Sequence, residues 1–314
     1  MDGARSSAAG AKFGSKVNQA WLKSNHIMVQ MISRRGFLQA GSAAALMTNI
    51  ASAKQLKTFG VQLYTVRSIL PKKPEETLKA IQAIGYREVE ATYDNLDKIW
   101  PALQSTTLKP VSIHLSESII MRGSDDDLAR AIEKVKQHGF AYAVFPWVNP
   151  PDRGGLDNMK ALAEKLNKAG EKCRAAGLSL CYHNHAFEFE PMDGTTRFQV
   201  LLDTLDKKLV GLELDVFWVS VAGRDPVEIL KQTSGRVHLL HLKDKAQGTP
   251  VMYKESVPAS TFKEVGHGTL DWPAILRAAE SAGVQHYFVE QDQTPGDPVE
   301  SLRQSYDYIS KLTF

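Results

Sequence analysis

The stretch YHNHAFEFE, residues 182–190, places two histidines, an asparagine and two glutamates within nine positions. Imidazole and carboxylate groups are the side chains that most often hold divalent metals and transfer protons in proteins. A single histidine, however, is often only a hydrogen-bonded core residue. The stretch is therefore compatible with a metal and proton-transfer site and with a polar strand end, and the surrounding elements must decide between them.

Short apolar runs alternate with longer amphipathic stretches from Phe59 to the end of the chain. Strands are expected at 59–65, 86–91, 110–115, 142–147, 178–184, 209–215, 236–242 and 286–291. Helices are expected at 74–85, 124–139, 156–177, 225–235, 270–283 and 297–312, with weaker patterns at 94–104 and 195–205. This alternation predicts an α/β fold, a single (β/α)8 barrel. A doubly wound sheet is the alternative, but the first strand continues into QLYTVRSIL and lacks a glycine-rich phosphate loop.

In such a barrel, catalytic groups come from the C-terminal ends of the strands. Six of the eight expected strands end in an ionisable residue, which a core strand does not need. Asp215, His241 and Glu290 end the sixth, seventh and eighth strands, which are neighbours around a barrel. One imidazole and two carboxylates suit one divalent metal ion such as Mn²⁺, Co²⁺, Fe²⁺, Zn²⁺ or Mg²⁺. A fourth ligand is expected from the fifth strand, where YHNHAFEFE stands.

The first 53 residues are expected to lie outside the barrel. Residues 33–53, SRRGFLQAGSAAALMTNIASA, combine a twin arginine, a short apolar run and a closing Ala-Ser-Ala. This pattern is typical of a removable twin-arginine export signal. It predicts an N-terminal extension and signal over 1–53 and a catalytic barrel over 54–314. The mature protein would be periplasmic or extracytoplasmic, without stable membrane association once the signal is removed.

The charge and the cysteines exclude two further classes of function. The formal net charge is +3, and residues 1–53 contribute +5 of it, which leaves −2 for residues 54–314. A basic nucleic-acid-binding surface therefore loses its support from composition. Cys173 and Cys181 are expected to be core thiols, and their spacing excludes a C-x-x-C redox motif. The long irregular stretch 243–268 is expected to be a functional or mobile loop.

Several motifs in order along the chain resemble the sugar phosphate isomerase/epimerase family, the xylose-isomerase-like TIM barrels. They are FGVQLYTVR, GYREVE, YHNHAFEF, GLELDVFWVSVAGRDP, GRVHLLHLKD and EVGHGTLDW. The resemblance implies a Glu, Asp, His and Glu metal set from strands five to eight, of which Asp215, His241 and Glu290 match the last three. The strand-five glutamate is replaced by Tyr182. Glu188 is therefore expected as the fourth ligand, and the neighbouring histidines are the alternatives.

The chemistry that the resemblance implies is proton abstraction next to the carbonyl of a keto-sugar or 3-keto-glycoside. Epimerisation, dehydration or elimination could follow. The residues expected to transfer protons or stabilise charge are His183, His185, Lys243 and Glu290. Gln62, Tyr64, Glu90, His114 and Trp218 are expected to contact the carbohydrate substrate. An endonuclease IV-like phosphodiesterase and a non-catalytic exported sugar-binding barrel are the alternative functions, and a homo-oligomer is expected only by analogy.

Overall fold

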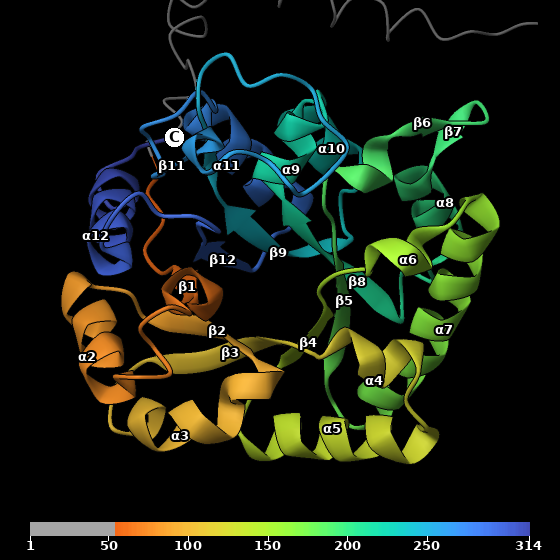
Figure 1. Ribbon diagram of the computed structural model, residues 1–314, viewed down its shortest axis with the longest axis horizontal. Helices are drawn as coiled ribbons and strands as arrows, with labels where there is room; N and C mark the ends of the chain where they lie inside the picture. Colours follow the sequence, from red (N-terminus) through yellow and green to blue (C-terminus); the bar gives the residue numbers. More distant parts are fainter. Residues whose placement is uncertain (1–53) are drawn as a thin grey trace, which may run out of the picture. The chain divides into compact units, whose positions relative to one another are not determined.

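The computed structural model describes residues 54–314, which form a closed barrel of eight parallel strands inside a ring of helices (Figure 1). The barrel strands are β1 (Gly60–Gln62), β2 (Glu88–Thr92), β3 (Lys109–His114), β4 (Tyr142–Phe145), β5 (Ser179–His183), β8 (Val210–Asp215), β9 (Val237–Leu242) and β12 (His286–Val289). They follow one another around the barrel, and β12 pairs with β1 to close it. The predicted (β/α)8 barrel is confirmed. The expected export signal lies outside the described residues.

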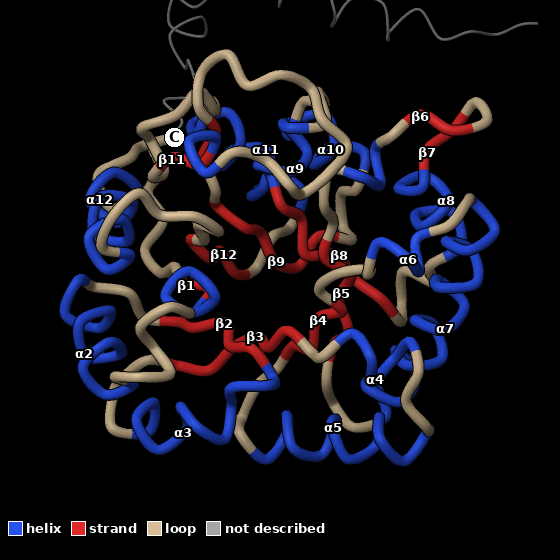
Figure 2. Tube along the Cα trace, in the orientation of Figure 1, coloured by secondary structure: helices blue, strands red, loops and turns tan. Residues whose placement is uncertain are grey.

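Each of the helices expected from the sequence is present and lies outside the strands (Figure 2). They are α2 (Pro74–Ile84), α3 (Leu96–Gln104), α5 (Asp125–Gln137), α7 (Leu156–Ala175), α8 (Arg197–Thr204), α10 (Pro226–Gln232), α11 (Trp272–Ala282) and α12 (Pro298–Ile309). Their ends carry the expected local chemistry. Ser124 and Asp127 form a reciprocal capping box at the start of α5, which satisfies backbone N–H groups that have no partner within the helix.

Three short helices and two short hairpins lie in the loops and have no clear periodicity in the sequence. The helices are α4 (Glu117–Met121), α6 (Pro150–Arg153) and α9 (Val216–Val221), and the hairpin strands are β6 (Pro191–Met192), β7 (Thr195–Thr196), β10 (Asp244–Lys245) and β11 (Phe262–Lys263). A 3₁₀ turn, Leu63–Val66, follows β1 directly. Tyr64 therefore lies in this turn and not in the first strand, where the sequence pattern predicts it.

A small apolar cluster, separate from the large core between strands and helices, fills the barrel interior. Its members come from five strands: Val111, Tyr142, Val144, Cys181, Leu239 and Phe288. The ring of His241 lies on this cluster, with its centroid 6.4 Å from that of Phe288. The polar residues at the C-terminal ends of the strands are thus supported from below by packed side chains. Cys173 and Cys181 are buried free thiols, as predicted.

Within the loop between β9 and α11, residues 243–268, one carboxylate joins the start of the loop to its end. Asp244 accepts hydrogen bonds from the backbone N–H groups of Gly266, Gly268, Thr269 and Leu270 and from Trp272 Nε1. A Cβ at Gly268 would lie 2.1 Å from Asp244 Oδ1, so only glycine fits there. The polar strand end at Asp244 is therefore a loop anchor.

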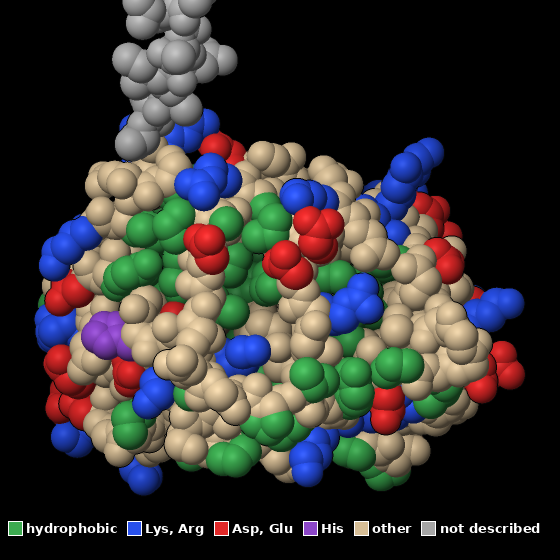
Figure 3. All heavy atoms as spheres, turned by 90° about the horizontal axis from the view of Figure 1, so that it is seen from above, with side chains coloured by type: hydrophobic (Ala, Val, Ile, Leu, Met, Phe, Trp, Pro, Cys, Tyr) green, Lys and Arg blue, Asp and Glu red, His purple; other side chains and the backbone are tan. Residues whose placement is uncertain are grey.

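The face of the molecule drawn in Figure 3 shows hydrophobic side chains toward its middle, with acidic and basic side chains among and around them. Such mixing is usual for the solvated side of amphipathic helices. Among residues 54–314, the helices are either too short or too polar to cross a membrane.

Candidate active site

A cavity of about 530 Å³ lies at the C-terminal ends of the barrel strands. The residues predicted for the site that line it are Tyr64, His114, His183, His185, Trp218, Lys243 and Glu290. They follow six different strands, so the closed sheet gathers residues that are far apart in the sequence. The closed barrel thus brings these strand ends to one cavity.

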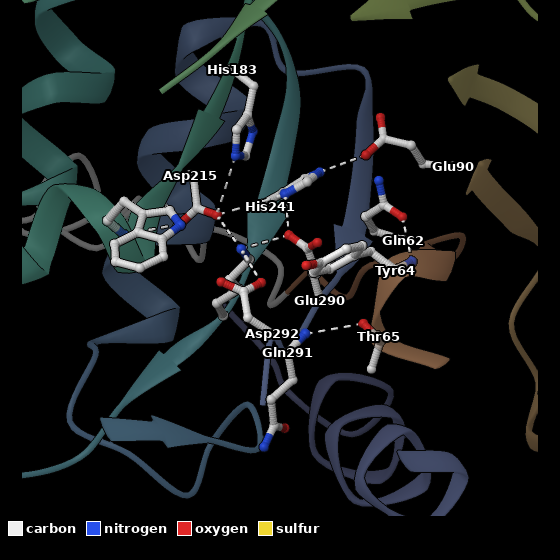
Figure 4. Close-up of polar contacts among 12 residues, drawn as sticks. Gln62, Tyr64, Thr65, Glu90, His183, Asp215, His241, Glu290, Gln291 and Asp292 are labelled. Atoms are coloured by element: carbon white, nitrogen blue, oxygen red, sulfur yellow. Dashed lines mark hydrogen bonds and ion pairs between the residues drawn. The ribbon is translucent and has the colours of Figure 1, made fainter. Parts of the chain in front are cut away.

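Asp215, His241 and Glu290 come together beside this cavity (Figure 4). His241 Nδ1 lies 2.9 Å from Glu290 Oε2 and 3.6 Å from Asp215 Oδ2. His241 Nδ1 and Asp215 Oδ2 are both buried and make no well-directed hydrogen bond within residues 54–314, although the Lys243 ammonium lies 3.0 Å from Oδ2 as its counter-charge. Buried polar atoms normally have partners. Two such atoms converging with a second carboxylate fit a divalent cation.

His241 is oriented by carboxylates on its other side. Its Nε2 lies 2.8 Å from Glu90 Oε1 and 3.4 Å from Glu213 Oε1. Burial by itself lowers the pKa of His241, but Glu213, Glu290 and Glu90 outweigh it and raise that pKa well above its usual value. Without a metal the ring is therefore an imidazolium, and its Nδ1–H faces Asp215 and Glu290. A cation that replaced the Nδ1 proton would find the ring held from behind by Nε2–H and Glu90, which is the usual arrangement behind a metal-bound histidine.

His183, like His241, has a buried glutamate beside one ring nitrogen and Asp215 near the other. Its Nδ1 lies 3.2 Å from Glu213 Oε2, and its Nε2 lies 4.0 Å from Asp215 Oδ2. Burial, together with His241 and His185, holds the pKa of His183 well below its usual value, so the ring is neutral. Its Nε2 lone pair can therefore join the atoms that face Asp215.

Glu213 was not predicted, although its carboxylate lies within 3.4 Å of ring nitrogens of three histidines, His114, His183 and His241. It lies two residues before Asp215 on β8 and is fully buried. Since side chains alternate along a strand, Glu213 and Asp215 both point into the barrel. The spacing of two residues from Asp215 within one strand is the signal in the sequence for Glu213.

His114 bridges the two buried glutamates. Its Nε2 lies 2.9 Å from Glu90 Oε1 and 2.7 Å from Glu213 Oε2. Burial lowers the pKa of His114, but Glu90 and Glu213 outweigh it and raise that pKa to about 10. His114 is therefore an imidazolium that offsets buried negative charge, and one edge of its ring still reaches the cavity.

The structure does not bring Glu188, the expected fourth ligand, to this group. Glu188 lies in the 3₁₀ turn Phe187–Phe189, where Oε1 accepts from the Tyr182 hydroxyl at 2.7 Å and Oε2 accepts from His185 N–H at 2.9 Å. Both oxygens are thus used to fix the turn after β5. Burial raises the pKa of Glu188 to about 8, so the group is largely protonated at neutral pH.

The raised pKa predicts a pH dependence of stability. The unfolded chain releases the Glu188 proton near the model-peptide value of 4.5, whereas the folded chain releases it only near 8. The folded state therefore holds more protons in this window, and the unfolding free energy should fall as pH rises through it, by up to about 1.4 kcal/mol per pH unit. Urea unfolding of metal-free protein should show this slope, and Glu188→Gln should remove it.

Glu190→Gln, in the same segment, is the matched control because Glu190 pairs with Arg197 at a half-buried position. It should keep the slope. Equal slopes in the wild type and Glu188→Gln would show that Glu188 has an ordinary pKa.

Lys243 lies at the centre of three carboxylates. Its Nζ is 3.0 Å from Asp215 Oδ2, 2.6 Å from Glu290 Oε2 and 2.9 Å from Asp292 Oδ1. Burial lowers the pKa of Lys243, but Asp215, Asp292 and Glu290 outweigh it and raise that pKa well above its usual value. Lys243 is therefore a buried ammonium that contacts two of the metal-facing oxygens and also lines the cavity.

His185 lies on the cavity wall with no well-directed hydrogen bond to Nδ1 from any residue in the described part of the chain. Its ring is 5.4 Å from that of Trp218. Burial, followed by the charge of Lys243, lowers the pKa of His185 to about 3. The ring is therefore neutral, and its Nδ1, beside the cavity, is left without a partner within residues 54–314.

Two residues expected to contact substrate lie away from the cavity wall. Gln62 and Glu90 are fully buried. Gln62 Oε1 accepts from Tyr64 N–H at 2.7 Å and so shapes the turn that presents Tyr64. Glu90 orients His241, as described above. Gln62 and Glu90 therefore position Tyr64 and His241 and do not line the cavity.

Residues 78–312 match the family model described as "Xylose isomerase-like TIM barrel". An inosose dehydratase of Clostridium perfringens is 28% identical over 167 residues, or 50% of this chain, and the chain spans only 56% of that relative. A sugar phosphate isomerase/epimerase from Parabacteroides distasonis has a TM-score of 0.65 at 24% identity, covering 83% of this chain and 97% of that one. An IolI protein with a bound zinc atom has a TM-score of 0.63 at 16% identity, covering 80% and 95%. The two structural likenesses show the shared fold.

Proposed function

The chain belongs to the family of xylose isomerase-like TIM barrels, and from that premise we propose that it is a divalent-metal-dependent enzyme acting on a carbohydrate. The reaction is removal of a proton next to the carbonyl of a keto-sugar or 3-keto-glycoside, followed by epimerisation, dehydration or elimination. The similarity to inosose dehydratase supports a substrate of this kind. The observation that carries the proposal is the convergence of Asp215, His241 and Glu290 beside a cavity that presents His185 and Lys243.

The metal would be held by Asp215 Oδ2, His241 Nδ1 and Glu290 Oε2, with His183 Nε2 in the place expected for Glu188. A carboxylate and imidazole set accepts Zn²⁺, Mn²⁺, Co²⁺ or Fe²⁺. When bound, such a cation stabilises the negative charge on oxygen that develops as a neighbouring C–H proton is removed. The zinc in the structurally similar IolI protein supports this assignment.

The remaining steps are performed by side chains on the cavity wall. His185 is neutral and accepts the proton at its free ring nitrogen. The Lys243 ammonium donates hydrogen bonds to the oxygen on which charge develops, in a site with little water. Trp218 and Phe262 are buried on the same wall and keep solvent from the reacting carbon.

The proposal is tested by proton exchange with solvent. Metal-supplemented protein is incubated in D₂O with 3-keto-glycosides, ketohexoses or inososes, and the products are followed by NMR. Deuterium should appear at one carbon next to the carbonyl, and EDTA should abolish its incorporation. Absence of exchange and of product with every substrate class, in protein shown to hold metal, would refute the proposal.

The fourth ligand is tested separately by metal content. We expect His183→Gln to weaken metal binding by about 10–100-fold, the usual effect of losing a ligand or its orienting partner. Glu188→Gln should retain the metal, because Gln can accept from His185 N–H and donate to the Tyr182 hydroxyl. Metal per chain is measured after dialysis against weak chelator. Loss of metal in Glu188→Gln with retention in His183→Gln would reverse the assignment.

Export by the twin-arginine route is also part of this proposal, on the pattern in residues 33–53. Replacing Arg34 and Arg35 with lysine should shift the protein from the periplasmic to the cytoplasmic fraction of cells that express it. Unchanged fractionation would refute the route.

A further inference from the structure

The wall of the cavity is rich in acidic side chains. Its carboxylates are Asp94, Glu117, Glu255, Glu290 and Asp292, and Lys243 is the single lysine or arginine among the lining residues in the described part of the chain. Lys243 is already paired with three carboxylates, and the charge of His114 faces Glu90 and Glu213. A phosphate ester brings a charge of about −1.5 to −2 and is usually met by free arginine or lysine side chains. The lining residues within 54–314 offer none, because Arg67, which stacks on Tyr64, is not among them and its guanidinium is held by two backbone carbonyl oxygens.

The helix N-termini beside the cavity do not provide an anion site either. The α9 N-terminus is capped by Asp215, whose Oδ1 accepts from Trp218 N–H at 3.0 Å. The first turn of α4 carries Glu117, which lines the cavity. The partial positive charge at both helix ends is thus already met by carboxylates. Electrostatics therefore favour an uncharged ligand.

The cavity is also larger than one sugar ring requires. Its volume of about 530 Å³ lies well inside the range of roughly 300–1,000 Å³ that is typical of sites for drug-sized ligands. The reacting sugar has to lie against His185, Lys243 and Glu290 at one end. Space for about one further ring remains beside Tyr64 and Gln293, which follow the paired strands β1 and β12.

Tyr64 presents an aromatic ring to the cavity, and its neighbours hold the ring in place. Its side chain is 43% exposed, and it and Val251 are the exposed large hydrophobic residues in the described part of the chain. The Arg67 guanidinium stacks on the ring, with Cζ 4.1 Å from its centroid. Arg67 is itself held by the carbonyl oxygens of Tyr64, at 3.0 Å, and Asp292, at 2.6 Å. The ring is ordered before any ligand binds, so little conformational entropy is lost on stacking.

We propose that the ligand of this cavity is an uncharged two-unit sugar: the keto-sugar lies at His185 and Lys243, and its second ring or aglycone stacks on Tyr64. This inference rests on the proposed function for the identity of the reacting unit. It makes Tyr64 a specificity-determining residue that contacts the part of the substrate that does not react.

Binding, measured without turnover, tests this inference apart from the proposed reaction. Three probes are titrated into the metal-loaded protein: a neutral keto-disaccharide, the corresponding keto-monosaccharide and the 6-phosphate of that monosaccharide. Quenching of tryptophan fluorescence reports occupancy, because Trp147 and Trp218 line the cavity. The disaccharide should bind about tenfold tighter than the monosaccharide, and the phosphate no tighter than its parent.

Tyr64→Ala should remove this tenfold advantage and change the monosaccharide Kd by less than about twofold, since the second unit alone loses its contact. Tyr64→Phe should behave as the wild type. Val251→Ala, at the other exposed hydrophobic residue and outside the cavity lining, should change none of the three affinities.

Tighter binding of the phosphate, equal weakening of both sugars in Tyr64→Ala, or failure of all three probes to bind would each overturn the inference. Binding with the predicted preferences but without deuterium exchange would support this inference and refute the proposed reaction. Deuterium exchange without tighter binding of the disaccharide would support the proposed reaction and refute this inference.

Discussion

Replacing Asp215 with asparagine is expected to reduce bound metal from about one ion per chain to near zero and to lower kcat/KM by about 10³-fold or more. The substitution changes one functional oxygen and little else. Metal content by elemental analysis and steady-state turnover of the substrate identified by deuterium exchange are the two measurements.

The reason lies in the separate roles of the two Asp215 oxygens. Oδ1 accepts from Trp218 N–H and begins α9, a role that asparagine fills as well as aspartate. Oδ2 is buried, lies 3.6 Å from His241 Nδ1 and has the Lys243 ammonium as its neighbouring positive charge at 3.0 Å. In asparagine this position becomes an NH₂ group, which has no lone pair or charge to offer a cation. The site is lost while the helix cap remains.

Asp225→Asn is the matched control. Asp225 caps α10 in the same way, accepting from Val227 N–H at 2.8 Å, and lies outside the cavity lining. Metal content and kcat/KM should be unchanged in this variant. If Asp215→Asn kept both, or if Asp225→Asn lost both, the metal site would not be where these contacts place it.

The barrel could be predicted from the sequence because buried parallel strands appear as short, nearly continuous apolar runs between amphipathic segments. The helix limits followed from local signals such as Ser124 at the start of α5 and Gly85 after α2. The turn at Tyr64 has no such signal. It forms because the Gln62 side chain caps the Tyr64 N–H, a contact that depends on the conformation of both residues.

The site was predictable only where its residues end a strand. Asp215, His241 and Glu290 follow from that rule, since neighbouring parallel strands bring their C-terminal ends together. Glu213 lies inside β8. Its partners His114 and His183 come from other strands, and the closed barrel brings them to it. Glu188 was chosen as the nearest acid after the fifth strand. The 3₁₀ turn that directs it to Tyr182 depends on tertiary contacts that sequence spacing does not reveal.

Lys243→Met is expected to have two opposite effects, on metal-free stability and on metal affinity. In the metal-free protein, the ammonium is the cation shared by Asp215, Glu290 and Asp292. Methionine keeps the apolar stem and removes the charge. Breaking a buried ion pair from one side typically costs about 3–5 kcal/mol, because the remaining charge has no partner. Urea unfolding in EDTA should show a loss of this size.

A divalent cation supplies the missing positive charge, so metal should restore more stability to Lys243→Met than to the wild type. Binding itself should be about tenfold tighter or more, since no ammonium then competes for Asp215 Oδ2 and Glu290 Oε2. Isothermal titration with Zn²⁺ or Mn²⁺ measures this directly. Turnover should nevertheless fall by about 10²–10³-fold, because the variant lacks the donor that faces the developing oxyanion.

Lys245→Met separates this effect from general loss of a lysine. Lys245 lies two residues further along, is partly buried and donates to the Ser220 carbonyl at 2.8 Å, outside the carboxylate group. Its removal should leave metal affinity and turnover unchanged. Metal binding that weakens in Lys243→Met would mean that the ammonium helps to assemble the site instead of competing for its oxygens. The direction of the change in Kd therefore decides whether Lys243 occupies the cation position before the metal arrives.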